Sequence, residues 1–580
     1  MALLAFLAVA VMTFGYIVTS SLNAASRFAS VDRAYNANVL NQARQALIGW
    51  MAMNAAGTDP NPGRLPCPEA PAFFADPANQ GVAAGSCTLP AVGRLPWRTL
   101  GLDRLVDDAG EPLWYVVSPG WALPTMVPIN SDTLGQLSLD GGEAVALIIA
   151  PGRPVTVVAG GNCAAWTQSR PIAGTPDLRN YLECENANSP ADANFVRRNA
   201  NATYNDQVLR VAAADVMPAL EAAIQDRLQR EIAPALRTVY TNANYTGIPS
   251  SSPMYPYAVT FANPGTSTYQ GASGVYQGLL PVNQASSMVA YASTPGSAVK
   301  TSSFGTIESQ SCWWESANDV RVCEGIYRED GTDPSRPIGI QLTATFNNVA
   351  MGLRTIDTAR YQVLARDDGT GMAWIPLSAS HEATMNTNGS VTLRFWATMP
   401  NIDAMGWMNI AEFRLRIERA VLDDHPLVKT DDATFGWFTR NQWHRSLFYA
   451  VAQQNTAAAL PSFGCGNTNC LRFNEGLGCG GGANWCNIRA LLVLAGGSLG
   501  NPPATRPNGN LADYFEYQNA DGGTFYEQRP MRRASNVANA NGPWNDRVVL
   551  VDWPPALPPL LTGTNPQAVS ISPLRLRVLP

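Results

Sequence analysis

The 580-residue chain has few charged residues, few lysines and few histidines. Charged residues make up 14% of it, against a usual share of about 25%, and the formal net charge is −6. Nucleic-acid binders typically carry a basic excess, so we expect no nucleic-acid partner. Only Lys300 and Lys429 are lysines, and His381, His425 and His444 are the only histidines. So few imidazoles leave little material for metal or acid–base chemistry.

The N-terminal segment carries no charged side chain as far as residue 26. Residues 2–21 are mostly apolar, and about 20 such residues can cross a hydrocarbon core of about 30 Å. No basic residue precedes the run, which favours a membrane helix over a cleaved signal peptide. We expect residues 1–26 to be the transmembrane part of a helix, with these side chains in the membrane or in a filament core: Leu3, Leu4, Phe6, Leu7, Val9, Val11, Phe14, Ile17 and Val18.

The helix is expected to continue beyond the membrane. No proline occurs before Pro60, and residues 27–56 are compatible with a helix that places Leu40, Leu47 and Met51 on one face. The whole rod would be about 80 Å long at 1.5 Å per residue. Its first part is apolar throughout, whereas its second part is amphipathic and must pack on a folded domain.

A run rich in proline and aromatic residues follows the predicted helix. It comprises GRLPCP at 63–68, Cys87, GRLPWRTLGL at 93–102 and DAGEPLWYVV at 108–117. Together with the apolar start, this run resembles the type IV pilin and type II secretion pseudopilin superfamily, in particular its large minor prepilin-like proteins, over about residues 1–120. The resemblance implies an α+β fold in which a long N-terminal helix precedes β-rich domains. It also implies a structural role in a filament.

Two departures from the family pattern bear on that role. Pilins normally begin with a short basic leader ending in glycine, which the sequence does not show, so we expect the given start to be a mature or misassigned one. Major pilins also carry a glutamate near the start of the mature helix, whereas the first acidic residue here is Asp32. The missing carboxylate resembles the minor pseudopilin at the filament tip, which has no upper neighbour to pair with.

Two segments of the chain carry the same ordered set of motifs. The first has LWYVV at 113–117, VALIIA at 145–150, YLECENAN at 181–188 and NDQVL at 205–209; the second has LFYAV at 447–451, ALLVLA at 490–495, YFEYQNAD at 514–521 and NDRVV at 545–549. The shared order predicts a duplicated β-rich, pilin-like module, at 57–210 and 430–580. Glu183 matches Glu516, and Asp206 matches Asp546. Such acids cap turns, meet an arginine or bind a cation; we favour the structural roles and expect no metal.

Three segments separate the predicted modules. Residues 207–240 form an apolar stripe typical of an amphipathic helix, with Pro234 expected to kink it. Residues 241–329 are rich in Ser, Tyr and Gly and indicate an irregular segment. Residues 330–425 alternate apolar and polar side chains, which predicts an antiparallel β-sandwich, either a scaffold or a site for an unknown surface ligand.

The cysteines are even in number and fall into local groups: Cys67 and Cys87; Cys163 and Cys184; Cys312 and Cys323; Cys465, Cys470, Cys479 and Cys486. This pattern favours disulfides formed in an oxidising compartment. The last group could instead hold zinc through four thiolates, but its wide, irregular gaps favour two disulfides.

Catalytic motifs are weak. Gly496–Gly500 reads G-x-S-x-G, but prolines follow it and no histidine lies after His444, so a nucleophile elbow is not expected. The acidic runs Arg366–Gly371 and Asp521–Thr524 fall short of a calcium loop and favour hairpin turns. The sequence therefore predicts neither catalytic residues nor a cofactor.

The sequence as a whole predicts a membrane-anchored minor pilin or pseudopilin-like subunit, tip-located and adhesive. Its expected partners are other pilin-like subunits, contacted through the N-terminal helix, and inner-membrane lipid before assembly. We expect a single pass through a bacterial inner membrane, with most of the chain periplasmic or extracellular. The alternatives are a permanently anchored binding protein, an anchored enzyme, or a secreted protein whose N-terminus is removed.

Overall fold

The computed structural model describes residues 32–552 apart from gaps at 88–90, 124–126, 160–162, 171–176, 189–192, 250–251, 284–298, 301–305, 316–319, 329–337, 368–372, 400–409, 461–462, 465–469, 475–485, 500–503 and 532–541. The predicted membrane span, with its apolar residues from Leu3 to Val18, lies outside this part. Within the described part, no helix combines the length and the apolar character that a bilayer crossing requires.

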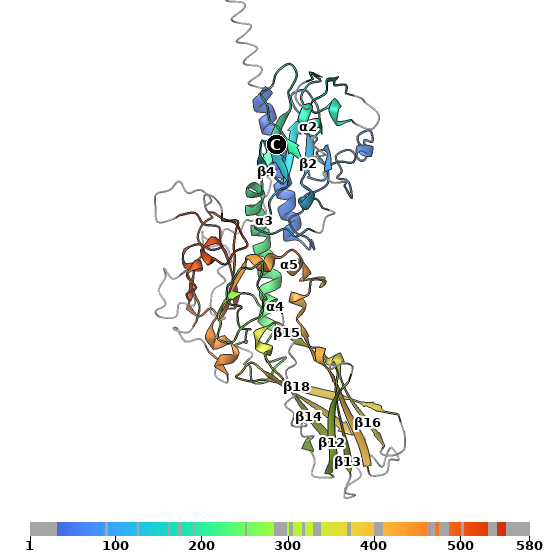
Figure 1. Ribbon diagram of the computed structural model, residues 1–580, viewed down its shortest axis with the longest axis vertical. Coiled ribbons are helices and arrows are strands. Elements are labelled where there is room, and N and C mark those ends of the chain that lie inside the picture. The colour runs from blue at the N-terminus through green and yellow to red at the C-terminus, as the bar shows by residue number, and fades with distance from the viewer. Residues whose placement is uncertain are drawn as a thin grey trace, which may run out of the picture. The chain divides into compact units, whose positions relative to one another are not determined.

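The architecture is mixed α+β with mostly antiparallel strands, which confirms the predicted fold class at that level. The chain divides into two compact units, Met1–Ile224 and Gln225–Pro580. Each unit is described by itself (Figure 1).

The first unit begins with a helix over residues 32–56. Its buried side chains recur at helical spacing and form one face: Asn36, Val39, Leu40, Ala43, Leu47, Met51 and Ala55. The opposite face is open, with Met53 68% exposed. Side chains that the sequence places on one stripe therefore enter the core of the unit.

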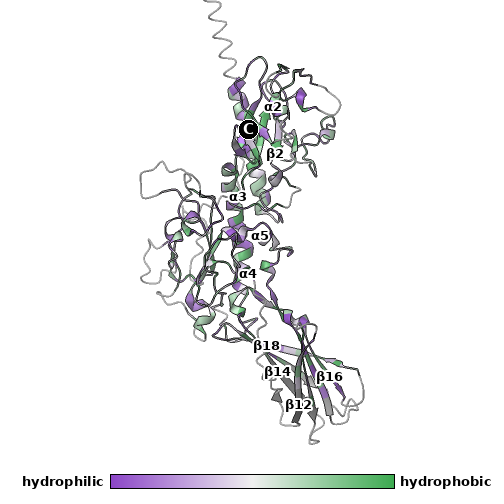
Figure 2. Ribbon diagram, in the orientation of Figure 1, coloured by the Kyte–Doolittle hydropathy of each residue, from purple (hydrophilic) through white to green (hydrophobic). Residues whose placement is uncertain are grey.

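A four-stranded antiparallel sheet forms the centre of the first unit, in the order β1-β2-β5-β9. Its strands are β1 (Ala91–Arg94), β2 (Trp114–Val117), β5 (Ala146–Ala150) and β9 (Gln207–Val211). Every residue of β2 and β5 is buried, so both faces of the sheet are covered. Figure 2 shows green, hydrophobic stretches among these strands. On one face Trp114 packs with Tyr181 and Phe195 in the core.

The second unit contains the end of a long helical segment. α3 (Ala213–Arg227), the π-helical turn η5 (Leu228–Ile232) and α4 (Ala233–Thr238) follow one another directly. The boundary between the units falls inside α3, after Ile224. Pro234 lies in the first turn of α4, and the predicted disturbance of the helix takes the form of the preceding π-helical turn.

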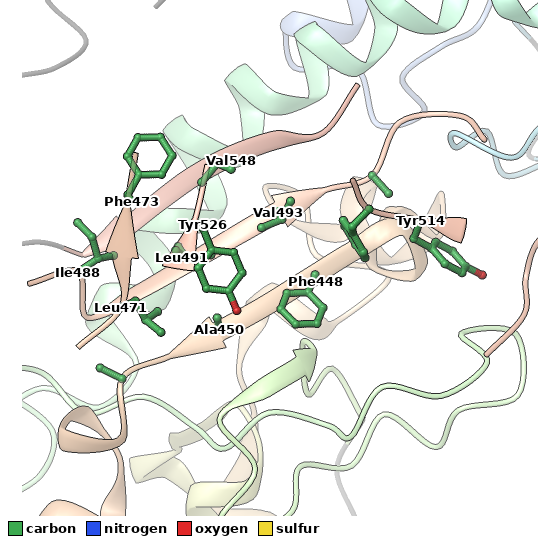
Figure 3. Close-up of a cluster of buried hydrophobic side chains, with 13 residues drawn as sticks. Phe448, Ala450, Leu471, Phe473, Ile488, Leu491, Val493, Tyr514, Tyr526 and Val548 are labelled. Carbon is green, nitrogen blue, oxygen red and sulfur yellow. The ribbon is translucent and has the colours of Figure 1, made fainter. Parts of the chain in front are cut away.

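The second unit has its own four-stranded antiparallel sheet, in the order β10-β22-β24-β26. Its strands are β10 (Gln277–Leu279), β22 (Leu447–Val451), β24 (Ala490–Leu494) and β26 (Arg547–Asp552). η5 and α4 lie against β26. Phe448, Val493 and Tyr526 belong to the core cluster drawn in Figure 3, which lies on one face of these strands.

The two sheets have the same strand order, the same strand directions and the same register at the first pair. In the first sheet Gly93 of β1 lies opposite Tyr115 of β2; in the second, Gly278 of β10 lies opposite Tyr449 of β22. The small parallel pairs also correspond, because β3 (Leu137–Leu139) pairs with β8 (Asn194–Phe195) and β23 (Arg472–Phe473) pairs with β25 (Phe525–Tyr526).

Both glycines are required by the close approach of another backbone segment. A Cβ atom on Gly93 would lie 2.8 Å from the carbonyl oxygen of Glu69. A Cβ atom on Gly278 would lie 1.8 Å from the carbonyl oxygen of Val259. In each case the approaching residue donates its amide to the next residue of the same strand, Glu69 to Arg94 at 3.0 Å and Val259 to Leu279 at 3.0 Å.

A β-sandwich is inserted between β10 and β22. One of its sheets has the order β11-β14-β19-β18, and the other has the order β12-β13-β20-β16-β17. The strands are β11 (Val299–Lys300), β12 (Thr306–Glu315), β13 (Val320–Arg328), β14 (Ile338–Phe346), β16 (Tyr361–Asp367), β17 (Ile375–Leu377), β18 (Ala379–Met385), β19 (Val391–Met399) and β20 (Ile410–Glu418). The two sheets pack through Tyr361 of β16, whose ring centroid lies 4.5 Å from that of Phe395 in β19.

Two predicted boundaries are wrong. Residues 207–211 form β9 instead of the first turn of a helix, which begins at Ala213. The segment 241–329 is not uniformly irregular, because it contains β10, β11, β12 and β13, so the strands of the sandwich begin at Val299 instead of residue 330. β12 mixes polar and aromatic residues without clean alternation, and this hides it from a search for period-two patterns.

Candidate functional site

The acidic residues that the sequence comparison aligns meet in a buried cluster in the first unit. One oxygen of Glu183 (Oε2) accepts the backbone N–H groups of Asn205 at 2.9 Å and Asp206 at 2.8 Å. One oxygen of Asp206 (Oδ2) accepts the N–H of Glu183 and the side-chain amide of Asn186, both at 3.0 Å. The cluster therefore fastens the segment before α2 (Cys184–Asn188) to the start of β9.

The second unit contains a cluster with the same four hydrogen bonds. Glu516 Oε2 accepts the N–H groups of Asn545 at 3.0 Å and Asp546 at 3.1 Å. Asp546 Oδ2 accepts the N–H of Glu516 at 2.9 Å and the side-chain amide of Asn519 at 3.0 Å. The first residue of β26 follows directly, so both clusters precede the last strand of their sheet.

The surroundings of the two clusters also correspond. The residue after each glutamate has a positive φ, +49° at Cys184 and +47° at Tyr517, although neither is glycine. An arginine flanks each cluster: Arg170 donates to the carbonyl of Gly152 at 2.9 Å, and Arg506 donates to that of Gly496 at 2.8 Å. The guanidinium groups lie 4.8 Å from the ring centroids of Tyr181 and Tyr514, respectively.

The electrostatics of each cluster follow from burial. Desolvation raises the pKa of Asp206 well above its usual value, and the neighbouring Glu183 raises it further; Asp546 behaves in the same way beside Glu516. In each pair the glutamate accepts the backbone N–H of the aspartate, and the aspartate accepts that of the glutamate. The two carboxyl groups are therefore adjacent and repel one another when both are ionised.

These acids have the structural role that the sequence favours. In each pair, one oxygen of the glutamate and one of the aspartate accept backbone N–H groups and a side-chain amide, and both aspartates are buried. Among the described residues, Cys163, Cys184 and Glu185 bring three ligand-type atoms within 4.8 Å of one another. Since Cys163 and Cys184 form a disulfide, their sulfur atoms are not thiolate ligands.

Disulfides join the cysteines that lie near one another in sequence, as predicted. The bonds are Cys67–Cys87, Cys163–Cys184 and Cys312–Cys323. Cys312 and Cys323 lie directly opposite each other on β12 and β13. Cys470 and Cys486 are also disulfide-bonded, which argues against a four-thiolate zinc site, whereas Cys465 and Cys479 lie outside the described residues.

The weak catalytic motifs do not come together. Ser498, the central residue of the G-x-S-x-G match, accepts the backbone N–H of Ala504 at 2.8 Å. The only histidine of that region, His444, is packed between aromatic rings, with its centroid 4.9 Å from that of Tyr269 and 6.1 Å from that of Phe438. Trp313 and Trp314 are half-buried on β12.

The environment of His444 predicts an acid-sensitive contribution to stability. Burial, with a smaller effect of nearby Arg445, lowers its pKa to about 4, so the folded protein holds the ring neutral. An unfolded histidine titrates near pH 6.5, so the contribution is complete above that pH and is lost as pH falls toward about 4, by roughly 2–3 kcal/mol. Replacing His444 by Gln should remove this pH-dependent contribution to stability. The measurement is hydrogen exchange of β22 in the variant and in the wild type, compared from about pH 7 to 4. Identical slopes in both proteins would contradict it.

Sequence reasoning missed the two asparagine amides and the two arginines of the clusters. Asn186 and Asn519 occupy the same position in the two aligned motifs that begin at Tyr181 and Tyr514. The alignment therefore contains the information needed to pair them.

Comparison with known proteins adds no relative. No protein-family model, no curated protein and no solved structure matches the chain.

Proposed function

We propose that this chain is a minor structural subunit of a type IV pilus or type II secretion-like filament, tip-located and with an adhesive role for its inserted sandwich. The observation that carries the proposal is the continuity of sequence from the apolar segment 2–21 into the helix over residues 32–56. One face of that helix is held in the first unit, and the other is open for contacts with further subunits.

The open face has the character that close helix packing needs. Gly49 lies on it with free space around its Cα, and Met53 is 68% exposed beside it. Small residues let neighbouring helices approach closely, and methionine adapts to irregular partner surfaces. The other side of the helix carries the bulk of the module, so the helix can serve as spine while the module faces outward.

The second unit supports a subunit built from two copies of one module. We infer that residues 32–211 and 213–552 derive from a single ancestral unit, in which a helix precedes a four-stranded antiparallel sheet. The second copy differs because the β10–β22 connection contains the sandwich. Its helix is buried around most of its surface, including Glu221 and Arg227, so only the first copy offers an open helix face.

The expected distribution of the protein tests the filament role. Cells that produce this chain should release it into the sheared surface fraction together with other subunits, and Met53→Glu should lower that release several-fold without unfolding the first unit. The matched control is Leu134→Glu, because Leu134 is 65% exposed but lies outside the helix. Quantitative immunoblots of sheared and membrane fractions measure both. If the wild-type protein stays in the membrane fraction, the chain is a permanently anchored protein instead.

A further inference from the structure

The two buried clusters around Glu183–Asp206 and Glu516–Asp546 have the geometry of proton-holding pairs. In each cluster, four N–H donors point at two oxygens, one from each carboxyl group. Asp206 and Asp546 are buried, and within the described part of the chain the second oxygen of each (Oδ1) has no N–H partner. Two adjacent carboxylates in such a place would repel strongly, whereas one shared proton turns repulsion into a hydrogen bond.

Among the described residues, the groups that face the first cluster are either uncharged or already in an ion pair, so they do not supply the positive charge that the proton would bring. Gln168 donates to Glu183 Oε1 at 2.7 Å, and Tyr204 contacts Asn186 at 3.0 Å; both are uncharged. Arg170 makes its ion pair with Glu111 at 3.3 Å, and Arg198 makes its ion pair with Glu185.

Arg506 and Arg529 face the second cluster, and Arg529 makes its ion pair with Glu527 at 2.8 Å. The positive charge of Arg506 lowers the pKa of the Glu516 carboxyl, against the larger effect of burial, which raises it. Its guanidinium donates to Gly496 and covers the ring of Tyr514. Trp544 donates its indole N–H to the carbonyl oxygen of Asp546 at 3.0 Å, so it leaves the carboxyl group alone.

We propose that each module holds one proton between its two buried carboxyl groups as part of its native fold, so that the attachment of β9 and of β26 tightens in acid and loosens in alkali. The reason is linkage: the folded module binds a proton that the opened module releases to water. The sign follows from the burial of two adjacent carboxyl groups, which favours the protonated pair in the folded module. Stability is greatest below the ordinary carboxyl pKa of about 4 and declines as pH rises from there toward the folded value.

Hydrogen exchange measured by mass spectrometry on the whole protein tests the proposal, with rates corrected for the intrinsic effect of pH. Above the ordinary carboxyl pKa of about 4, the opening constant of β9 and that of β26 should each rise with pH, with a limiting slope of about tenfold per pH unit for one proton per module. Asp206→Asn should flatten the slope in β9 and leave that of β26 unchanged, because an amide can donate permanently where the shared proton did. Asp546→Asn should do the reverse.

Controls keep the test decisive. Asp521→Asn removes an exposed carboxylate near the second cluster and should leave both slopes unchanged. If Asp206→Asn does not fold, Glu183→Gln offers the same replacement from the other side of the pair. Infrared spectra of the wild type at neutral pH should contain the carbonyl band of a protonated carboxyl, and each Asn variant should lose part of it. Opening constants that do not change with pH in the wild type, or the absence of that band, would overturn the proposal.

Discussion

Replacing Trp114 by Ala is expected to destabilise the first sheet by about 3–5 kcal/mol, since the change removes a fully buried aromatic side chain and leaves a large cavity. The ring centroid of Trp114 lies 5.0 Å from that of Tyr181 and 6.0 Å from that of Phe74, so two aromatic contacts are lost with it. Its indole N–H has no hydrogen-bond partner among the residues that the structure describes, so the expected loss is one of packing. Hydrogen exchange of β5 measures the effect.

The matched variant is Phe448→Ala, at the corresponding position of the second sheet (Figure 3). Its ring centroid lies 5.5 Å from that of Phe515 and 6.2 Å from that of Tyr526. We expect a loss of similar size, about 3–5 kcal/mol, confined to the protection of β24. If either variant loosened both sheets equally, the two modules would unfold as one cooperative unit and the assignment of separate cores would be wrong.

Replacing Glu231 by Ala is expected to cost the second unit roughly 3 kcal/mol. Its carboxylate lies 3.2 Å from Arg227, whose side chain is only 3% exposed, and also accepts the indole N–H of Trp437 at 2.7 Å. The change removes a charge partner from a buried guanidinium and leaves a donor unpaired. The measurement is protection of α5 (Gly436–Arg440) and α4 against exchange.

The control for Glu231 is an ion pair of similar geometry on the surface. Glu418 accepts from Arg360 at 2.8 Å, but both side chains are more than 40% exposed. Glu418→Ala should therefore change stability by less than about 1 kcal/mol. An equal effect of the two substitutions would show that burial of Arg227 does not determine the strength of its pair.

The parts of the fold that could be predicted are those with local signals. Short apolar runs such as ALIIA and LLVLA identify buried strands, and the order of these runs gives the two sheets. The pairing of β10 with β22 could not be predicted, because β10 has three residues and its partner follows more than a hundred residues later. The apolar stripe predicts the helix that leads the second copy, but its sequence carries no motif that links it to the helix over residues 32–56.

The candidate site was also predictable only in part, because local motifs show which residues correspond but not which residues touch. Matching positions identified Glu183 with Glu516 and Asp206 with Asp546, but sequence does not reveal that each glutamate and aspartate touch. That contact depends on a turn with positive φ at Cys184 and Tyr517, two residue types that rarely adopt it.

The place of the sandwich within the second sheet has an evolutionary consequence. The insert leaves from one strand and returns to its antiparallel neighbour, about 4.8 Å away, so a tight turn could close the same gap. Residues 95–113 make the equivalent connection in the first sheet without any added domain. A domain inserted in this way can be lost, exchanged or enlarged while the host sheet keeps every strand pairing, which allows the sandwich to change in evolution faster than the framework that carries it.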